Sequence, residues 1–380
     1  MRVCSALLAS LAALAALGLG CTDSGAERAA TAAGTATSTA ASGATLPPSA
    51  SPPVPIATVT VQVPEGPPTE RLLLLEGPAL VLQERSGERS ELARIDVASG
   101  VAAFPAWSPD GASIAFVRRT FFAGDPAADW GDDVFVLPAA GGEARLVRPH
   151  AEQGEQVFGL AWMPDGRALL LGRVDVELRD GIPFGIVGTA IVELDVEAGT
   201  ERTVVDDGYD PSVSADGSRV AFTRLGEILG ESSVVVADLD GSNATTVAST
   251  NSFEVLRLPR IAPDGGSVVF TAAVPFEFSS NGASDSPGPD WLAALLGPLW
   301  PRPAAAHGVP MDLWLVDVDT GAIDRLTAIG EDDPYPAWSA DGETIVFIGT
   351  NGTYEVEADG SGLIRIGEGR FDGQLAVDPR

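Results

Sequence analysis

The sequence predicts an all-β fold: a six-bladed β-propeller of four-stranded antiparallel blades that close into a ring. Two hairpin patterns predict the blades, because each recurs six times along the 380 residues and the two are interleaved. A third observation predicts the closure. The last repeat stops after its first strand, so we expect N-terminal strands from Leu72 to Arg94 to complete that blade by pairing beside residues 371–377.

The first pattern is an aromatic residue or proline, a core residue, an Asp-Gly pair and then a short β-rich run. One copy runs from Phe104 to Gly111 and is followed by Ile114 to Val117. Five copies are complete and the sixth is cut short, and their spacing is that of propeller blades. Their aspartates are Asp110, Asp165, Asp216, Asp264, Asp341 and Asp378.

The second pattern is an apolar run, an acidic turn with glycine and another apolar run. Asp, Asn and Gly suit such hairpin turns, since Asp bonds its own backbone and Gly accepts a positive φ. This pattern also has six copies, and the first precedes the first Asp-Gly copy. The turns end the segments 96–100, 138–142, 195–199, 238–241, 317–321 and 358–362.

The N-terminal region predicts export and a membrane anchor. Residues 1–20 carry one charge, at Arg2, followed by a small and apolar run, which is typical of a signal peptide. Cys21 follows small residues as in the lipobox of bacterial lipoproteins, so we expect it to carry lipid; the alternative is an ordinary signal peptide cut elsewhere. Residues 21–70 are rich in Ala, Ser, Thr and Pro and predict a disordered tether, which leaves residues 71–380 as the propeller.

The charge balance limits the partners. The chain has 53 acidic and 23 basic residues, all of them arginine, and a formal net charge of -30. Such a surface repels phosphate backbones and anionic headgroups, so we expect no nucleic-acid partner and no electrostatic membrane docking. The absence of lysine also excludes Schiff-base chemistry.

The aromatic-Ser-Pro-Asp-Gly repeat, seen at Trp107 to Gly111 and in related form at Trp338 to Gly342, resembles the TolB-type propeller repeat. The same repeat occurs in the non-catalytic propellers of prolyl-oligopeptidase-like enzymes. The resemblance covers about residues 71–380 and implies a six-bladed propeller that binds other molecules. TolB itself has an α/β domain before its propeller, whereas this chain has the low-complexity tether there.

The residues that enter each inner strand should surround one mouth of the ring axis. We expect a protein or peptide-like ligand of polar or cationic character to bind at this mouth, with the alternative that the aromatics only plug the axis and the acids are solvated. The expected residues are Phe104, Asp210, Arg257, Asp333, Tyr335 and Asp372.

The longer connections should lie on the same face as the mouth, because turns alternate between the two ends of an up-and-down blade. These connections are Arg118 to Asp133, Val174 to Thr189 and the insertion from Pro275 to Pro310. The insertion contains Trp291 and Trp300, which we expect to help form the binding site. The alternative is that both tryptophans fold back and cover their own blade.

The sequence indicates binding more than catalysis. It has no Gly-x-Ser-x-Gly motif, and His150 and His307 are its only histidines, so we interpret both as exposed loop residues. We expect no cofactor. Calcium at Asp125, Asp129, Asp132 and Asp133 is one alternative, and a metal-assisted hydrolase or lactonase using the axial carboxylates Asp210, Asp333 and Asp372 is another. The function we predict is a monomeric, lipid-anchored binding protein of a bacterial cell envelope that faces the periplasm or the exterior.

Overall fold

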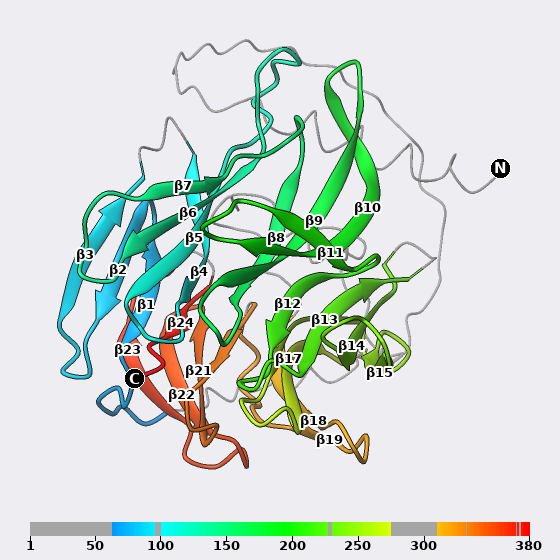
Figure 1. Ribbon diagram of the computed structural model, residues 1–380. Coiled ribbons are helices and arrows are strands. Elements are labelled where there is room, and N and C mark those ends of the chain that lie inside the picture. The colour runs from blue at the N-terminus through cyan, green and yellow to red at the C-terminus, as the bar shows by residue number, and fades with distance from the viewer. Residues whose placement is uncertain are drawn as a thin grey trace, which may run out of the picture.

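The computed structural model describes residues 63–95, 100–226, 230–274, 310–331, 333–369, 371 and 374–380. These residues form 24 β-strands and no helix. The strands make six four-stranded antiparallel sheets arranged as the blades of a ring (Figure 1). The predicted fold class is therefore confirmed. No helix in the described part of the chain is long and apolar enough to span a bilayer.

The blades are numbered in chain order. Within each blade the strands are given from the innermost strand outward. Blade 1 contains β24 (Ala376–Val377), β1 (Leu72–Glu76), β2 (Ala79–Gln83) and β3 (Arg89–Arg94). Blade 2 contains β4 (Val101–Trp107), β5 (Ser113–Arg119), β6 (Asp132–Pro138) and β7 (Arg145–Arg148). Blade 3 contains β8 (Gln156–Trp162), β9 (Ala168–Arg179), β10 (Ile182–Asp195) and β11 (Glu201–Val205).

The other three blades follow the same order. Blade 4 contains β12 (Tyr209–Val213), β13 (Arg219–Leu225), β14 (Ser232–Asp238) and β15 (Thr245–Ser249). Blade 5 contains β16 (Val255–Ile261), β17 (Ser267–Ala273), β18 (Asp312–Asp317) and β19 (Ile323–Arg325). Blade 6 contains β20 (Tyr335–Trp338), β21 (Thr344–Gly349), β22 (Gly352–Glu357) and β23 (Ile364–Glu368).

The Asp-Gly motif forms the turn between the first and second strands of a blade. In blade 2 the Ser108 hydroxyl donates to Asp110 Oδ1 at 2.6 Å, and the Gly111 amide donates to the Ser108 carbonyl at 2.8 Å. Gly111 has a φ of +64°, which a residue with a Cβ adopts only at a cost. The Ser-Asp bond recurs at Ser214 with Asp216 and at Ser339 with Asp341, so the repeated residues encode a repeated turn.

The core lies between neighbouring blades and is built from the inner, second and third strands, with its largest rings on the second strands. The fourth residue of this strand is a fully buried phenylalanine in four blades: Phe116, Phe222, Phe270 and Phe347. Each blade thus presents a large ring to its neighbour, and burying such a side chain contributes roughly 2 kcal/mol. Stacking blade on blade lets a chain with short strands bury a continuous apolar core.

The ring closes as predicted, between the two ends of the described chain. The C-terminal strand β24 pairs antiparallel with β1, with Leu72 opposite Val377 and Leu73 opposite Ala376. The paired segment is shorter than the expected 371–377, because β24 comprises two residues. Blade 1 therefore takes its inner strand from the C-terminal segment and its other three strands from the N-terminal part of the propeller.

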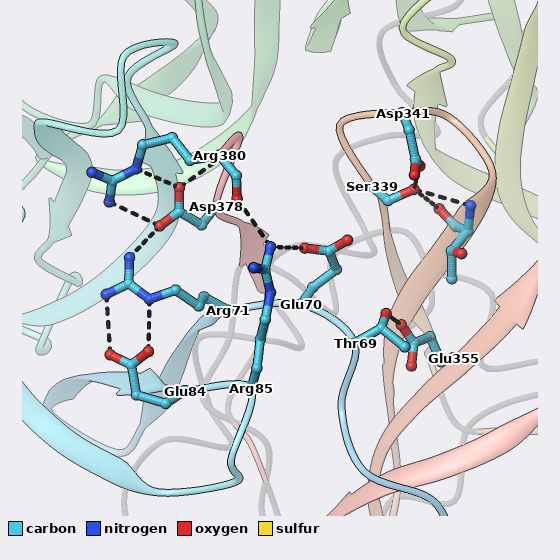
Figure 2. Close-up of polar contacts among 11 residues, drawn as sticks. Thr69, Glu70, Arg71, Glu84, Arg85, Ser339, Asp341, Glu355, Asp378 and Arg380 are labelled. Atoms are coloured by element: carbon cyan, nitrogen blue, oxygen red, sulfur yellow. Dashed lines mark hydrogen bonds and ion pairs between the residues drawn. The ribbon is translucent and has the colours of Figure 1, made fainter.

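Ion pairs just after the short β24 strand join the C-terminal segment to the start of β1 (Figure 2). Arg71 binds both carboxylate oxygens of Glu84, at 2.8 and 3.1 Å, and also contacts Asp378. Arg380 donates to Asp378 through its Nε and a terminal nitrogen, both at 3.0 Å. Asp378 is the sixth motif aspartate, but it joins β1 to the C-terminus instead of capping a turn of its own.

The segment before β1 lies along the outer strand of blade 6. Gly66 donates to the Arg365 carbonyl at 3.0 Å, and Arg365 donates to the Pro64 carbonyl at 2.7 Å. Glu65 forms a parallel bridge with Arg365. Contacts with the propeller thus begin by residue 64, within the segment 21–70 that composition assigns to the tether. They cover part of the edge of β23 and strengthen the junction between blades 6 and 1.

The segment from Val174 to Thr189 is not a loop as expected. It continues β9 and β10 as one hairpin, paired from Val174 with Thr189 up to Arg179 with Ile182. The two strands have 12 and 14 residues, against 5 to 7 for most second and third strands of the other blades. The cause is the alternation of apolar residues from Val174 to Leu178, which satisfies a strand period.

Candidate binding face at the mouth of the ring

The two ends of the ring differ in the length of their connections. One end, here called the turn face, carries the short Asp-Gly turns, such as 108–112 and 339–343. The other end, here called the mouth face, carries the start of each inner strand from β4 to β20. It also carries the connection 120–131 and the tip of the β9–β10 hairpin at 180–181, and both project beyond the ring (Figure 1). The predicted segregation of long connections to one face is correct for these two.

A bulge shapes each inner strand where it enters the mouth. Two residues of the inner strand stand opposite one residue of the second strand in blades 2 to 5. In each bulge one residue has a positive φ: Phe104, Gly159, Asp210 and Leu258. These four positions lie six residues before the motif aspartate, so the repeat encodes the bulge. In blade 6 the positive φ falls instead on Asp333, two residues before Tyr335.

Aromatic rings and one arginine fill the mouth between blades 2 and 4. Phe104 packs edge-on against Phe158 at 6.0 Å, and Phe158 packs likewise against Tyr209 at 6.3 Å. The Arg119 guanidinium lies 5.2 Å from the Phe104 ring centre and 4.5 Å from that of Phe158. Phe104 therefore belongs to a packed aromatic cluster with a cation on its faces.

Arg119 is buried, and its charge is satisfied inside the protein. Its guanidinium binds Asp132 at 2.7 Å and donates to the Val157 carbonyl at 2.7 Å. Asp132 also accepts from the Val157 amide at 2.9 Å, so the pair ties β5 and β6 to β8. Burial raises the pKa of Asp132, and the nearby Arg119 charge opposes this.

Two buried ion pairs form the other side of the mouth. Asp210 accepts from Arg260 at 3.0 Å, and Arg257 pairs with Asp333 across blades 5 and 6. Burial raises the pKa of Asp210 against the charges of Arg260 and Arg257, and burial raises the pKa of neighbouring Tyr209. Each pair joins adjacent blades, because the partners come from different inner strands or the segments before them.

The structure brings four of the predicted mouth residues together and buries them. Phe104, Asp210, Arg257 and Asp333 are buried, and Tyr335 is half-buried. The alternative in which the acids are solvated is therefore wrong for Asp210 and Asp333. The other expected site residues, Asp372, Trp291 and Trp300, lie outside the described residues, as do Cys21 and His307.

Sequence reasoning missed Arg119, Phe158, Tyr209 and Arg260. Phe158 and Tyr209 each stand one residue before the positive-φ position of their blade, so a column taken one residue earlier in the repeat could have found them. Arg119 and Arg260 have no counterpart at the same place in every repeat. Their position follows only from the packing of one blade against the next.

The four aspartates considered for calcium bind other partners. Asp132 pairs with Arg119, and Asp133 pairs with Arg118 at 2.5 Å. Asp125 accepts from the Ala127 amide at 2.9 Å within its own loop. In the described residues no three His, Cys, Asp or Glu side chains are grouped as metal ligands would be.

His150 is not the exposed loop residue that was expected. Its Nδ1 lies 2.8 Å from Asp133 Oδ1, and its Nε2 lies 3.1 Å from Asp129 Oδ1. Burial lowers the pKa of His150, but the hydrogen bonds and charges of Asp133 and Asp129 outweigh it and leave the pKa raised. When it carries a proton on each nitrogen, the imidazole donates to both carboxylates and holds the connection 120–131 against the ring.

Comparisons with solved structures identify the fold. The chain is similar to TolB from Acinetobacter baumannii, with a TM-score of 0.55 and 17% identity over 84% of this chain and 68% of that one. It is also similar to a chain of the nidogen/laminin complex, with a TM-score of 0.52 and 11% identity over 81% of this chain and 98% of that one. No protein-family model matches the sequence, and no curated protein matches it. The chain has a TolB-like six-bladed propeller fold.

Proposed function

We propose that this protein is a cell-envelope lipoprotein whose propeller binds a protein partner through its mouth face. The TolB-like fold supports a protein-interaction scaffold, and the nidogen/laminin chain is a propeller crystallised with a protein partner. Export and anchoring follow from the expected signal peptide at residues 1–20 and lipid at Cys21. In this proposal the propeller is monomeric and faces the periplasm or the cell exterior.

The observation that carries the proposal is the asymmetry between the two faces. The turn face repeats short turns of two kinds, whereas the mouth face carries a long hairpin and a long connection. A rigid ring with projecting segments on one end is the usual arrangement of a binding scaffold. The buried Arg119–Asp132 pair at the mouth supports this role, because with the Val157 carbonyl it fixes blade 2 to blade 3, the two blades that carry those segments.

Catalysis by axial carboxylates finds less support in the geometry. A metal-assisted hydrolase or lactonase would use Asp210 and Asp333 as metal ligands. Each of these carboxylates already pairs with an arginine, whose positive charge balances it as the metal ion would. Metal binding would have to displace the half-buried Arg260 and the buried Arg257, and the Arg257 guanidinium would then be left buried without its carboxylate partner. Calorimetric titration with manganese or calcium tests this alternative, since a stoichiometric heat would support it.

The partner should carry positive charge near its contact residues. A net charge of -30 attracts basic polypeptides and repels nucleic acid and anionic lipid. Recovery of the partner from a detergent-solubilised envelope fraction should therefore weaken as salt is raised.

Selective blocking of each face tests the proposal. Cys4 and Cys21 are the only native cysteines, so Val274→Cys on the mouth face and Ala140→Cys on the turn face can each be coupled to a bulky polyethylene glycol maleimide. Both positions are exposed. Blocking at residue 274 should abolish recovery of the partner and blocking at residue 140 should not. Equal recovery from both blocked proteins would overturn the proposal.

The anchor has its own test. Replacing Cys21 by Ser should release the protein from the membrane fraction, because the predicted lipid is its only attachment in this proposal. Retention of the variant to the same extent as the wild type would show that Cys21 is not the anchor.

A further inference from the structure

The β9–β10 hairpin carries an exposed apolar surface that the ring does not need for its own packing. Five large apolar side chains in the described residues are exposed, and three of them lie on β10: Ile182 at 41%, Ile186 at 36% and Val187 at 63%. The register pairs Ile182 with Arg179 and Ile186 with Val176, so these two side chains lie on opposite faces of the hairpin, and Ile186 and Val187 are adjacent along the strand edge. Exposed apolar residues gathered on one projecting element indicate an interaction site.

Two described segments support the hairpin. A Cβ on Gly181 would meet Pro126, and one on Gly154 would touch both Leu178 and Trp130, so the connection 120–131 and the segment before β8 pack against it. The outer strand β11 pairs with β10 only from Ile191 to Leu194. Among the described strands, residues 182–190 of β10 therefore have β9 as their one neighbour, and their outer edge is open.

The charges on the two strands of the hairpin are paired internally. Arg173 binds Asp175 at 3.2 Å, and Arg179 binds Glu177 at 3.1 Å. The Arg179 guanidinium also lies 3.3 Å from the centre of the Phe184 ring. The apolar surface is thus nearly neutral locally, although the whole chain carries a net charge of -30. A partner can therefore make apolar contact with the hairpin strands without the charge repulsion that the acidic surface exerts on an acidic partner elsewhere.

Two further carboxylates stand at the tip. Asp125 and Asp180 are exposed, and the contact between Gly181 and Pro126 brings the two short segments that carry them together. No described arginine pairs with either of them. A partner that reaches the apolar surface would therefore gain by placing basic side chains at the tip.

We infer that the outer side of the β9–β10 hairpin binds an extended polypeptide segment with apolar side chains flanked by basic ones. The charge pattern selects this occupant. A second copy would bring another net charge of -30, and an anionic membrane surface would be repelled by Asp125 and Asp180. An open strand edge beside apolar side chains is a surface on which extended peptides dock. This inference rests on the proposed function and names the place and chemistry of its contact.

Two register shifts in β10 limit which strands can pair with its open edge. The pairing with β9 slips between Pro183 and Gly185 and again between Ile186 and Gly188, so Phe184 and Val187 are the extra residues. Such bulges interrupt the backbone ladder and prevent indiscriminate pairing of edges. Side chains must then supply much of the affinity, which makes Ile186 and Val187 the residues to change.

The test uses the full mature chain and a dye-labelled peptide of alternating valine and threonine with arginines at both ends. Fluorescence anisotropy should show saturable binding to the wild type. The double variant Ile186→Asp with Val187→Asp should weaken it at least about ten-fold. Leu146→Asp is the matched control, because Leu146 is 45% exposed on β7 away from the hairpin, and it should leave binding unchanged. A peptide with glutamates in place of the arginines should bind at least about ten-fold more weakly.

Several outcomes would overturn the inference. They are the absence of saturable binding by the wild type up to about 1 mM peptide, an equal loss in the Leu146 control, and unchanged affinity in the double variant. Binding to phosphatidylcholine vesicles without peptide binding, or dimerisation lost in the double variant without peptide binding, would identify a different occupant and also overturn it. If blocking at Val274 abolishes partner recovery while the double variant leaves recovery intact, the proposed function stands and this inference fails.

Discussion

Replacing Asp378 by Ala should destabilise the whole propeller, because Asp378 links the C-terminal segment to the first strand of the ring. Its side chain is 0% exposed and contacts both Arg71 and Arg380. Beyond these contacts, β24 pairs with β1 at two residues, and the Asp378 amide donates to the Arg71 carbonyl at 3.0 Å. Loss of the carboxylate should therefore loosen β24 and open the ring between blades 6 and 1.

The expected cost follows from the contacts that are lost. Removing one member of a buried ion pair costs roughly 3–5 kcal/mol. Arg71 and Arg380 are 25% and 51% exposed and can recover water, so we expect about 3 kcal/mol, at the low end of that range. For a domain of this size this corresponds to a fall of about 6 °C in Tm. Asp341→Ala is the matched control, because Asp341 is an exposed motif aspartate that caps only its own turn, with a cost of about 1 kcal/mol (Figure 2).

Urea unfolding of the mature wild type and both variants, followed by circular dichroism, measures these differences. The pH dependence adds a second check. Burial raises the pKa of Asp378, but the hydrogen bonds from Arg380 and the charges of Arg380 and Arg71 outweigh it, so the folded-state pKa is lowered. The stabilisation is then complete above the unfolded pKa and is lost as the pH falls through the folded pKa. The gap between wild type and Asp378→Ala should close below about pH 4. A loss no larger than that of Asp341→Ala would refute the reasoning.

Three further predictions concern the mouth and the blade interfaces. His150→Gln should lower stability more at about pH 5 than at about pH 9, because the folded pKa of His150 is raised and its stabilisation is lost as the pH rises through that value; equal losses in urea titrations would contradict this. Arg257→Met should lower the free energy of unfolding by about 3 kcal/mol, because it leaves Asp333 without its guanidinium partner. Adding Asp333→Asn should recover much of this loss in thermal unfolding. A double variant as unstable as the single one would contradict this explanation. Gly172→Ala should cost about 3 kcal/mol because its Cβ would overlap a backbone carbonyl of β8, whereas Gly77→Ala, with nothing near its Cβ, should cost about 1 kcal/mol; similar values for the two would show that backbone overlap is not the cause.

The repeat pattern was enough to predict the blades and their closure. Each Asp-Gly pair places a turn, and Ser108 with Asp110 shows why the residue types recur: the same hydrogen bond forms in several blades. The unpaired final repeat ending near Asp378 predicted that β24 would join β1. The turns depend on local contacts, which a repeated sequence specifies directly, and the closure follows from the number of strands that the repeats leave without a partner.

The mouth could be located but not described from the sequence. Alignment on the motif identified the column through Phe104 and Asp210, and the structure shows that this column is the position of a bulge, which was not predicted. That Asp210 and Asp333 are buried in ion pairs depends on Arg260 and Arg257, which come from neighbouring strands at no fixed spacing. The pairing of β9 with β10 beyond the ring was missed for another reason. The alternation of apolar residues from Val174 to Leu178 is a strand signal in the sequence, but the length variation of the connections led to the expectation of a loop.

The binding role of the mouth face is tested most directly by site-specific photocrosslinking in intact cells. A benzophenone side chain is placed at Val274 or Asn251 on the mouth face, or at Ala140 or Ala198 on the turn face, all of them exposed positions. Irradiation should give a crosslinked protein species from the two mouth-face positions and none from the two turn-face positions. Crosslinks of equal yield from both faces, or from the turn face alone, would contradict a binding role for the mouth face.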